Sequence, residues 1–287
     1  MTKQMHKAEK AYKNLEFLTS PDARVIRLIS EFLEPARRFR HEGIKDTIVF
    51  FGSARILPRA KARQHLKEAS RRLKGNDRLS SKAQNDLDGA KIDLEMSRYY
   101  EDAVKLSGLL TKWSNGLRQK NRFVISSGGG PGIMEAANKG AKLAKGRSVG
   151  LNISLPFEQN SNPYIPDELN FDFHYFFMRK LWFVYLSKAM VMFPGGFGTF
   201  DESFEVLTLL QTRKIKKKVT VVLYGKEYWQ KTINFENLIR LKMISPEDLK
   251  IFHFADTPDD AYDYIVRDLR KNYPGETAEE TESPGVV

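Results

Sequence analysis

The sequence predicts an α/β protein with a doubly wound, mostly parallel, Rossmann-like sheet, because short apolar runs alternate with helical patterns and glycine-rich turns follow two of the runs. The apolar runs lie at 122–127, 148–155, 189–193 and 219–224. Strands that alternate with helices at this spacing form βαβ units with right-handed crossovers, which places neighbouring strands parallel in one sheet.

Helices are predicted between these runs, at 131–145, about 174–187 and 199–212, and a last helix begins at Pro258. An earlier apolar run, Ile48–Phe51, ends at Gly52 and is typical of a buried parallel strand that enters a loop. We therefore expect one Rossmann-like domain over 47–272. Residues 273–287 are polar and lack periodicity, which predicts a disordered tail.

Two helical additions to this domain are predicted. Residues 1–46 form an N-terminal helical extension, whose helical pattern over 8–42 is interrupted near Ser20, a candidate N-cap. Residues 58–120 form a helical insertion with two halves. An apolar stripe from Ile92 to Leu117 recurs at steps of three and four in its second half, so we expect that helix to pack on the sheet.

Basic residues are concentrated in the first part of the chain. The sequence has 47 Lys and Arg against 36 Asp and Glu, for a net charge of +11. Residues 1–122 carry 27 basic and 15 acidic side chains, whereas the remainder carries 20 and 21. Such an excess can attract a polyanion. Solvated helix faces are the favoured interpretation over a nucleic-acid site, because aromatic and basic residues do not interleave as they do in base-stacking proteins.

Several classes of site are excluded by residue usage. The chain has no cysteine, and its five histidines are scattered without metal-ligand spacing, so we expect no disulfide framework and no zinc site. No stretch approaches the roughly 20 apolar residues that span a bilayer, and the first residues lack the apolar core of a secretory signal. We expect a cytoplasmic protein with no membrane partner and no metal.

The first glycine-rich turn, SSGGGPGIME at 126–135, follows a predicted strand and opens a predicted helix. Gly129, Gly130 and Gly132 allow backbone amides to approach a ligand closely, and the positive end of the helix dipole favours an anion. The spacing matches neither the dinucleotide fingerprint nor the triphosphate P-loop. It indicates a smaller phosphate ligand.

The second turn, PGGFGTFDE at 194–202, also joins a strand to a helix. Thr199 lies at the helix start, and Glu202 lies about one turn later. A tight turn without a ligand would explain either glycine loop alone. Two such loops on neighbouring strands instead predict a ligand crevice at the carboxyl ends of the sheet.

These motifs resemble the LOG (Lonely Guy) family, formerly labelled lysine decarboxylase-like. The hallmark PGGxGTxxE of that family stands at Pro194–Glu202, and its second signature stands at Met178-Arg179-Lys180. The stretch GGGPGIMEAANKGA at 128–141 and FGSAR at 51–55 also resemble loops of the family. The resemblance covers about residues 47–225.

The resemblance implies hydrolysis of the N-glycosidic bond of a nucleoside 5′-monophosphate, either AMP or a cytokinin riboside 5′-monophosphate, to the free base and ribose 5-phosphate. It implies no cofactor and a homodimer or higher homo-oligomer. Arg179 and Glu202 match the catalytic pair. The residues that match substrate contacts are Ser53, Arg55, Gly129, Gly130, Gly132, Glu158, Lys180, Gly195, Gly196, Phe197, Gly198, Thr199, Asp201 and Thr208.

Elementary chemistry agrees with these roles. Departure of a base leaves an oxocarbenium-like ribosyl cation, which a carboxylate such as Glu202 can stabilise, while Arg179 can grip phosphate or ribose oxygens. Structural alternatives remain for both, because a glutamate in a first helical turn can serve the helix dipole and Arg179 can neutralise a nearby aspartate. The competing functional hypothesis is a non-catalytic nucleotide sensor or carrier on the same fold.

Overall fold

The protein is built around one seven-stranded sheet in which every strand pair is parallel, as seen in a computed structural model that describes residues 8–74, 81–120, 122–155 and 160–277. The predicted parallel α/β fold is confirmed. The strands, in spatial order, are β4 (Asn170–Phe173), β3 (Ser148–Ile153), β2 (Val124–Ser127), β1 (Thr47–Phe51), β5 (Ser187–Met192), β6 (Thr220–Tyr224) and β7 (Phe252–Ala255).

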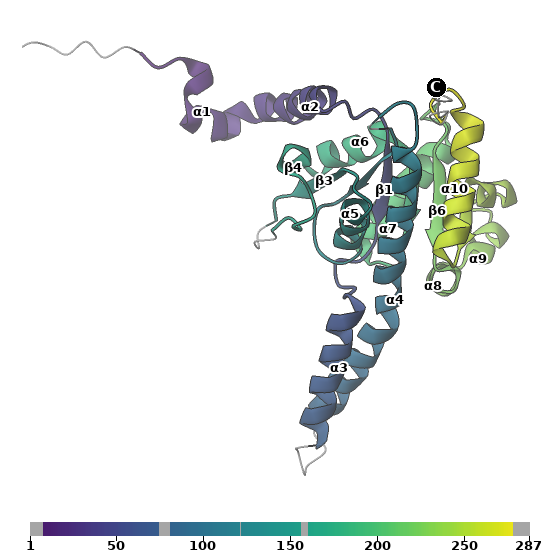
Figure 1. Cartoon of the computed structure of the whole chain (residues 1–287). Helices are drawn as coiled ribbons and strands as arrows, with labels where there is room; N and C mark the ends of the chain where they lie inside the picture. The colour runs from purple at the N-terminus through teal and green to yellow at the C-terminus, as the bar shows by residue number, and fades with distance from the viewer. Residues whose placement is uncertain (1–7, 75–80, 121, 156–159, 278–287) are drawn as a thin grey trace, which may run out of the picture.

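Helices cover both faces of the sheet (Figure 1). Alternate residues of β1 point to opposite faces: Ile48 and Phe50 pack in one core cluster, and Val49 and Phe51 pack in the other. The first cluster is completed by α4 (Ser81–Asn115), α5 (Ile133–Leu143) and α10 (Pro258–Asn272). The second is completed by α2 (Arg24–His41), α6 (Phe176–Leu186), α7 (Phe197–Gln211), α8 (Lys226–Thr232) and α9 (Phe235–Arg240).

Strand β4 is an edge strand that the sequence pattern did not reveal. It has four residues, of which Phe171 and Phe173 are buried and Asp172 is exposed, inside a segment whose aromatic residues mask the alternation. Its pairing with β3 joins Leu151 to Phe171 in register. Tertiary pairing therefore decides this strand, since four residues carry too little local signal.

The insertion forms a helical hairpin of α3 (Arg59–Lys74) and α4 that projects from the body (Figure 1). Helix α4 has 35 residues, about 50 Å at 1.5 Å per residue. From Tyr99 to Leu117 its apolar stripe is buried against the sheet, as predicted. Ile92 is 58% exposed, contrary to the predicted stripe. The N-terminal half of α4 extends beyond the sheet and packs against α3 instead.

The N-terminal extension is helical but attaches to the body at few points. It comprises two short 3-10 turns, α1 (Leu15–Thr19) and α2. Ser20 does not act as the predicted N-cap, since its hydroxyl donates backward to the carbonyl of Phe17. Helix α2 is held by Trp182 of α6, whose indole N–H donates to the carbonyl of Glu31 at 3.0 Å.

The C-terminal tail starts later than predicted. Residues 273–277 pack on the body: Tyr273 donates its hydroxyl to the carbonyl of Lys218, and Thr277 is buried. Glu276 pairs with the buried Arg122, which also pairs with the buried Asp46. A local composition pattern could not predict these contacts, because their partners lie far away in sequence. Residues 278–287, also predicted as tail, lie outside the described residues.

No helix among the described residues is both long enough and apolar enough to cross a membrane.

Candidate functional site

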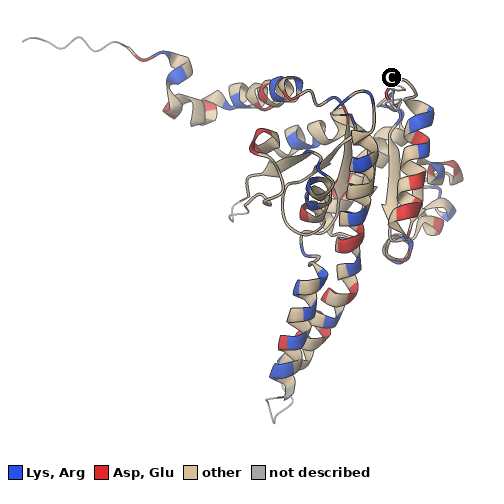
Figure 2. Cartoon of the chain, viewed as in Figure 1, with Lys and Arg blue, Asp and Glu red and all other residues tan. Residues whose placement is uncertain are grey.

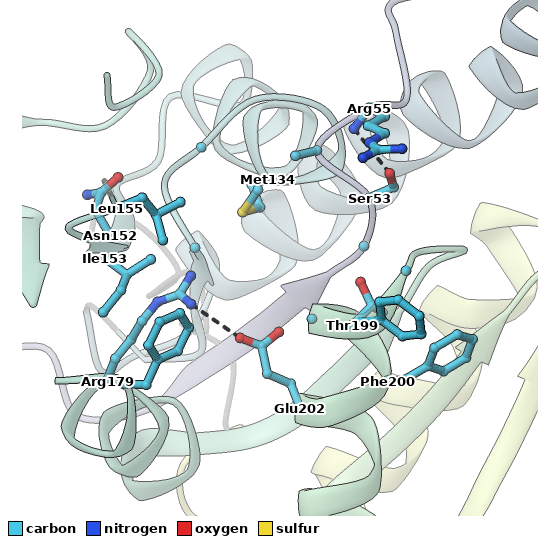
Figure 3. Close-up of a pocket in the computed structure, with 18 residues that line it drawn as sticks. Ser53, Arg55, Met134, Asn152, Ile153, Leu155, Arg179, Thr199, Phe200 and Glu202 are labelled. Atoms are coloured by element: carbon cyan, nitrogen blue, oxygen red, sulfur yellow. Dashed lines mark hydrogen bonds and ion pairs between the residues drawn. The ribbon is translucent and has the colours of Figure 1, made fainter. Parts of the chain in front are cut away.

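A crevice of about 650 Å³ opens at the carboxyl ends of the central strands. It lies where the chain order reverses, since β2 follows β1 on one side of the sheet and β5 lies on the other. Its walls come from the loops after β1, β2 and β5 and from the first turns of α6 and α7 (Figure 3). The crevice is therefore at the position that the two glycine turns predict.

Backbone hydrogen bonds at Ser53 join the three loops. The Ser53 N–H donates to the carbonyl of Pro194 at 3.0 Å, and the Ser53 carbonyl accepts from the Ile133 N–H at 3.1 Å. The loop after β1 thus lies between the two glycine turns and fixes the distance between them. Ser53 and Arg55 both line the crevice.

Backbone conformation and close packing explain why glycine stands at two positions of the first turn. Gly129 and Gly132 have positive φ angles of 75° and 69°, which other residues rarely adopt. A Cβ atom would lie 2.2 Å from Asn152 Oδ1 at Gly129 and 2.3 Å from the Ser53 carbonyl oxygen at Gly132. Neither residue lines the crevice, and the close approach of Asn152 and Ser53 explains why glycine stands at both positions.

Gly196 and Gly198 have no such steric reason. A Cβ atom at either position would meet nothing within 4 Å, and both residues line the crevice, as does Gly130. They flank the start of α7, whose N-terminus has no side-chain cap. An open, uncapped helix start with small residues is the arrangement that binds an anion through backbone N–H groups.

Arg179 reaches the crevice from α6 and is nearly buried. Its Nε donates to the carbonyl of Leu151 at 2.7 Å, and its guanidinium lies over the ring of Phe183 at 5.0 Å. Burial lowers the pKa of Arg179, although the charge of Glu202 opposes this shift. The guanidinium is thus fixed by the strand end and the helix before any ligand arrives.

Glu202 projects from the second turn of α7 toward Arg179 (Figure 3). The Glu202 Oε1 atom lies 3.4 Å from Arg179 Nη1, a long contact that leaves room for the carboxylate to bind something else. Burial raises the pKa of Glu202 to about 7, and the attraction of Arg179 only partly offsets the burial. A carboxylate with this pKa can exchange a proton near neutral pH.

A buried amide network holds the first glycine turn. Asn162 donates its Nδ2 to the carbonyls of Gly129 and Gly130 at 3.0 and 3.1 Å and to Asn138 Oδ1 at 2.9 Å. Asn138 also accepts from the hydroxyl of Ser127 at 2.6 Å. Neither asparagine was predicted, because the network joins the turn, a helix and a distant loop, and no local pattern marks them.

Some predicted contact residues lie away from the crevice. Lys180 points outward, where its Nζ lies 2.7 Å from Asp201 and 3.3 Å from Glu205. Burial lowers the pKa of Lys180, but its hydrogen bond to Asp201 and the charge of Glu205 outweigh this effect, so the pKa is raised. Thr208 is exposed further along α7.

Four other predicted residues complete the comparison. Gly195 packs against Thr199 and lines a smaller neighbouring cavity. Phe197 and Thr199 line the crevice, and the Phe197 side chain is 94% exposed. Glu158 lies outside the described residues. The structure thus brings together Ser53, Arg55, Gly130, Arg179, Gly196, Phe197, Gly198, Thr199 and Glu202.

The crevice also includes residues that the motifs did not single out as contacts. Met134 lies at the start of α5, Asn152 lies within β3, Leu155 follows that strand, and Phe176 and Phe200 come from the first turns of α6 and α7. The polar Asn152 within a predicted apolar strand was an available signal. The described residues contain no group of three or more His, Asp or Glu side chains placed to hold a metal ion.

Comparison with known proteins supports the motif-based resemblance. Residues 134–265 match the family described as "Possible lysine decarboxylase". No curated protein matches the chain. A molybdenum cofactor binding protein from the phototrophic bacterium Rippkaea orientalis is 18% identical, with 60% of this chain and 88% of that one aligned at a TM-score of 0.43. The molybdenum cofactor carrier protein of Chlamydomonas reinhardtii is 19% identical, over 59% and 87% of the two chains, at 0.39.

The amide network generates a prediction about stability. Replacing Asn138 by Ala should lower the free energy of unfolding by about 1–3 kcal/mol, because buried partners lose their hydrogen bonds. Urea denaturation measures this change. Asn115→Ala, at an exposed asparagine, is the control and should cost less than about 0.5 kcal/mol. Equal costs for the two variants would contradict the assigned role of the network.

Proposed function

Because residues 134–265 carry the lysine decarboxylase-like (LOG) family match, we propose that the protein hydrolyses the N-glycosidic bond of a nucleoside 5′-monophosphate. One observation carries the proposal: the buried Glu202 carboxylate, with its raised pKa, faces Arg179 beside an uncapped helix start. AMP and N6-substituted AMP, including cytokinin riboside monophosphates, are the proposed substrates. The products are the free base and ribose 5-phosphate.

The 5′-phosphate binds at the start of α7. Gly196 and Gly198 leave the backbone N–H groups accessible, and the helix dipole favours the negative charge. Thr199 lines the same wall and supplies a hydroxyl. Glu202 lies one turn along the helix from this end, so a phosphate held there places the ribose beside the carboxylate.

The reaction passes through a ribosyl cation. The C1′–N bond breaks and its electron pair moves to the base, while the oxygen of a water molecule bonds to C1′. Glu202 stabilises the positive charge and accepts the proton of that water, and the departing base takes up a proton to complete the balance. Arg179 orients the ribosyl phosphate.

Replacing Glu202 by Gln should lower the rate of base release by about 10²–10⁴-fold, the range for loss of an acid–base group. Chromatography of free base, after incubation with AMP or N6-substituted AMP, measures the rate. Glu205→Gln is the matched control, because Glu205 lies on the same helix but binds Lys180 outside the crevice. Tight nucleotide binding by calorimetry without turnover in the wild-type protein would instead identify a carrier or sensor.

The pH dependence tests the protonation state of Glu202. Since burial raises its pKa to about 7, the ionised form required here is lost as the pH falls below that value. The kcat/KM for base release should rise about tenfold per pH unit below pH 7 and level off above it. A profile that falls as the pH rises through 7 would assign the essential proton to Glu202 as an acid.

We also propose that the protein is a homodimer or higher oligomer through α6 and the helices beside it. Exposed apolar side chains gather on α6 and α7, namely Phe176, Phe177, Leu181, Tyr185 and Phe204. Apolar residues of α2 continue this surface, because Phe32 stacks on Trp182 of α6 at 5.7 Å. Patches of this kind are typical of subunit interfaces.

Replacing Phe177 by Glu should convert the oligomer to a monomer, because the new charge would be buried in the interface without a partner. Light scattering coupled to gel filtration measures the mass at micromolar concentration. Leu143→Glu is the control, since Leu143 is an equally exposed apolar residue at the end of α5. A monomeric wild-type protein would contradict the proposal.

A further inference from the structure

The projecting α3–α4 hairpin carries a concentrated positive charge that the crevice does not use. Helix α3 contains seven Lys or Arg residues and one acidic residue, Glu68. The carboxylate of Glu68 accepts a hydrogen bond from Gln64 at 2.9 Å. Six of the basic residues are exposed, namely Arg59, Lys61, Arg63, Lys67, Arg71 and Arg72. Figure 2 shows Lys and Arg along α3, whereas α4 carries basic and acidic residues together.

Four of these cations form one stripe. Arg59, Arg63, Lys67 and Arg71 follow one another at steps of four residues, which turns only about 40° per step around an α-helix. The steps are about 6 Å along the axis, so the stripe is about 18 Å long. The opposite side of α3 carries Ala62 and Ala69, which are buried in the hairpin. The stripe therefore faces solvent on a rigid, protruding support.

Within the described part of the hairpin, no acidic side chain lies at ion-pair distance from Arg63, Lys67 or Arg71. Among the acids of α4, Asp88 pairs with Lys91 at 2.8 Å, and Asp93 lies 3.7 Å from His65 of α3. Glu101 accepts the backbone N–H of Arg59 at 3.0 Å. The charges of Arg63, Lys67 and Arg71 are therefore the ones available to an external anion.

The geometry points to the phosphate backbone of a nucleic-acid duplex as the partner, and we propose that the α3 stripe binds it without sequence preference. A duplex carries one charge per about 1.7 Å of axis with both strands counted, so an 18 Å length of duplex carries about ten phosphates, more than the four cations of the stripe can contact. A membrane surface fits less well, because an interfacial helix needs an exposed apolar face and α3 buries its alanines against α4. Base stacking is not expected, since α3 has no Phe, Tyr or Trp.

Sequence alone favoured solvated helix faces for these residues. Two structural observations change the interpretation: the cations align on one face of a protruding hairpin, and the nearby acids do not neutralise them. Basic residues on the body of the protein are arranged differently. Lys180 and Arg147 pair with acids at 2.7 and 2.5 Å, and the exposed Lys214, Lys216, Lys242 and Lys250 do not follow one another along one long helix. The α3 stripe therefore differs from the exposed lysines of the body by its alignment on a protruding helix.

Fluorescence anisotropy with the full chain and a labelled DNA duplex of mixed sequence tests this inference. With four phosphate contacts, the logarithm of the association constant should fall linearly with the logarithm of the KCl concentration, with a slope of about −3.6. The association constant should therefore fall ~100-fold between about 50 and 200 mM KCl. One variant carries all four substitutions Arg59→Gln, Arg63→Gln, Lys67→Gln and Arg71→Gln. It should lose this salt dependence and bind the duplex at least tenfold more weakly at the lower salt concentration. Millimolar AMP should not compete, so this test is independent of the crevice.

A matched control removes the same charge elsewhere. Lys214, Lys216, Lys242 and Lys250 are exposed on the body of the protein, and their fourfold change to Gln should alter duplex affinity less than twofold. Circular dichroism checks that both variants keep the helical content of the wild type. The inference is overturned if the two variants weaken binding equally, if the wild type does not bind the duplex at low salt, or if it binds anionic vesicles and not the duplex.

Discussion

Backbone hydrogen bonds at Ser53 hold the two glycine turns at a fixed separation, and the crevice depends on them. One bond reaches Pro194 of the second turn, and the other reaches Ile133 of the first. Both turns end parallel strands next to β1, so the loop after β1 lies beside each of them at the carboxyl edge. A residue without a backbone N–H at position 53 would remove the bond to the second turn.

Burial then determines the chemistry of the two charged groups in the crevice. Burial raises the pKa of Glu202 to about 7, and the attraction of Arg179, whose Nη1 lies 3.4 Å from the carboxylate, opposes this shift only in part. The position of Arg179 depends on the N-terminal extension as well. The carboxylate of Glu31 in α2 accepts the backbone N–H groups of His174 and Tyr175 at 2.8 and 3.2 Å, at the start of the helix that carries Arg179. The extension therefore holds the segment that leads into α6.

Two regions of the protein suit anions of different size. The crevice offers backbone N–H groups and one buried guanidinium, which fit a single small phosphate. The α3 stripe offers several exposed cations spread over about 18 Å, which fit many phosphates of an extended polyanion. A crevice with a carboxylate of raised pKa is unsuited to a polyanion, because the added negative charge would oppose ionisation of Glu202.

The sequence by itself determined the parallel α/β fold and the two glycine turns, because strand runs and turn residues are local in the chain, and the resemblance of its motifs singled out Arg179 and Glu202. Tertiary structure decided the rest. The edge strand β4, the Asn138–Asn162 network and the outward turn of Lys180 depend on contacts between distant segments. Tertiary structure also determines the pKa of Glu202 and the lack of neutralising partners for the cations of α3. Burial and neutralisation both depend on the groups that the folded chain places around each charge.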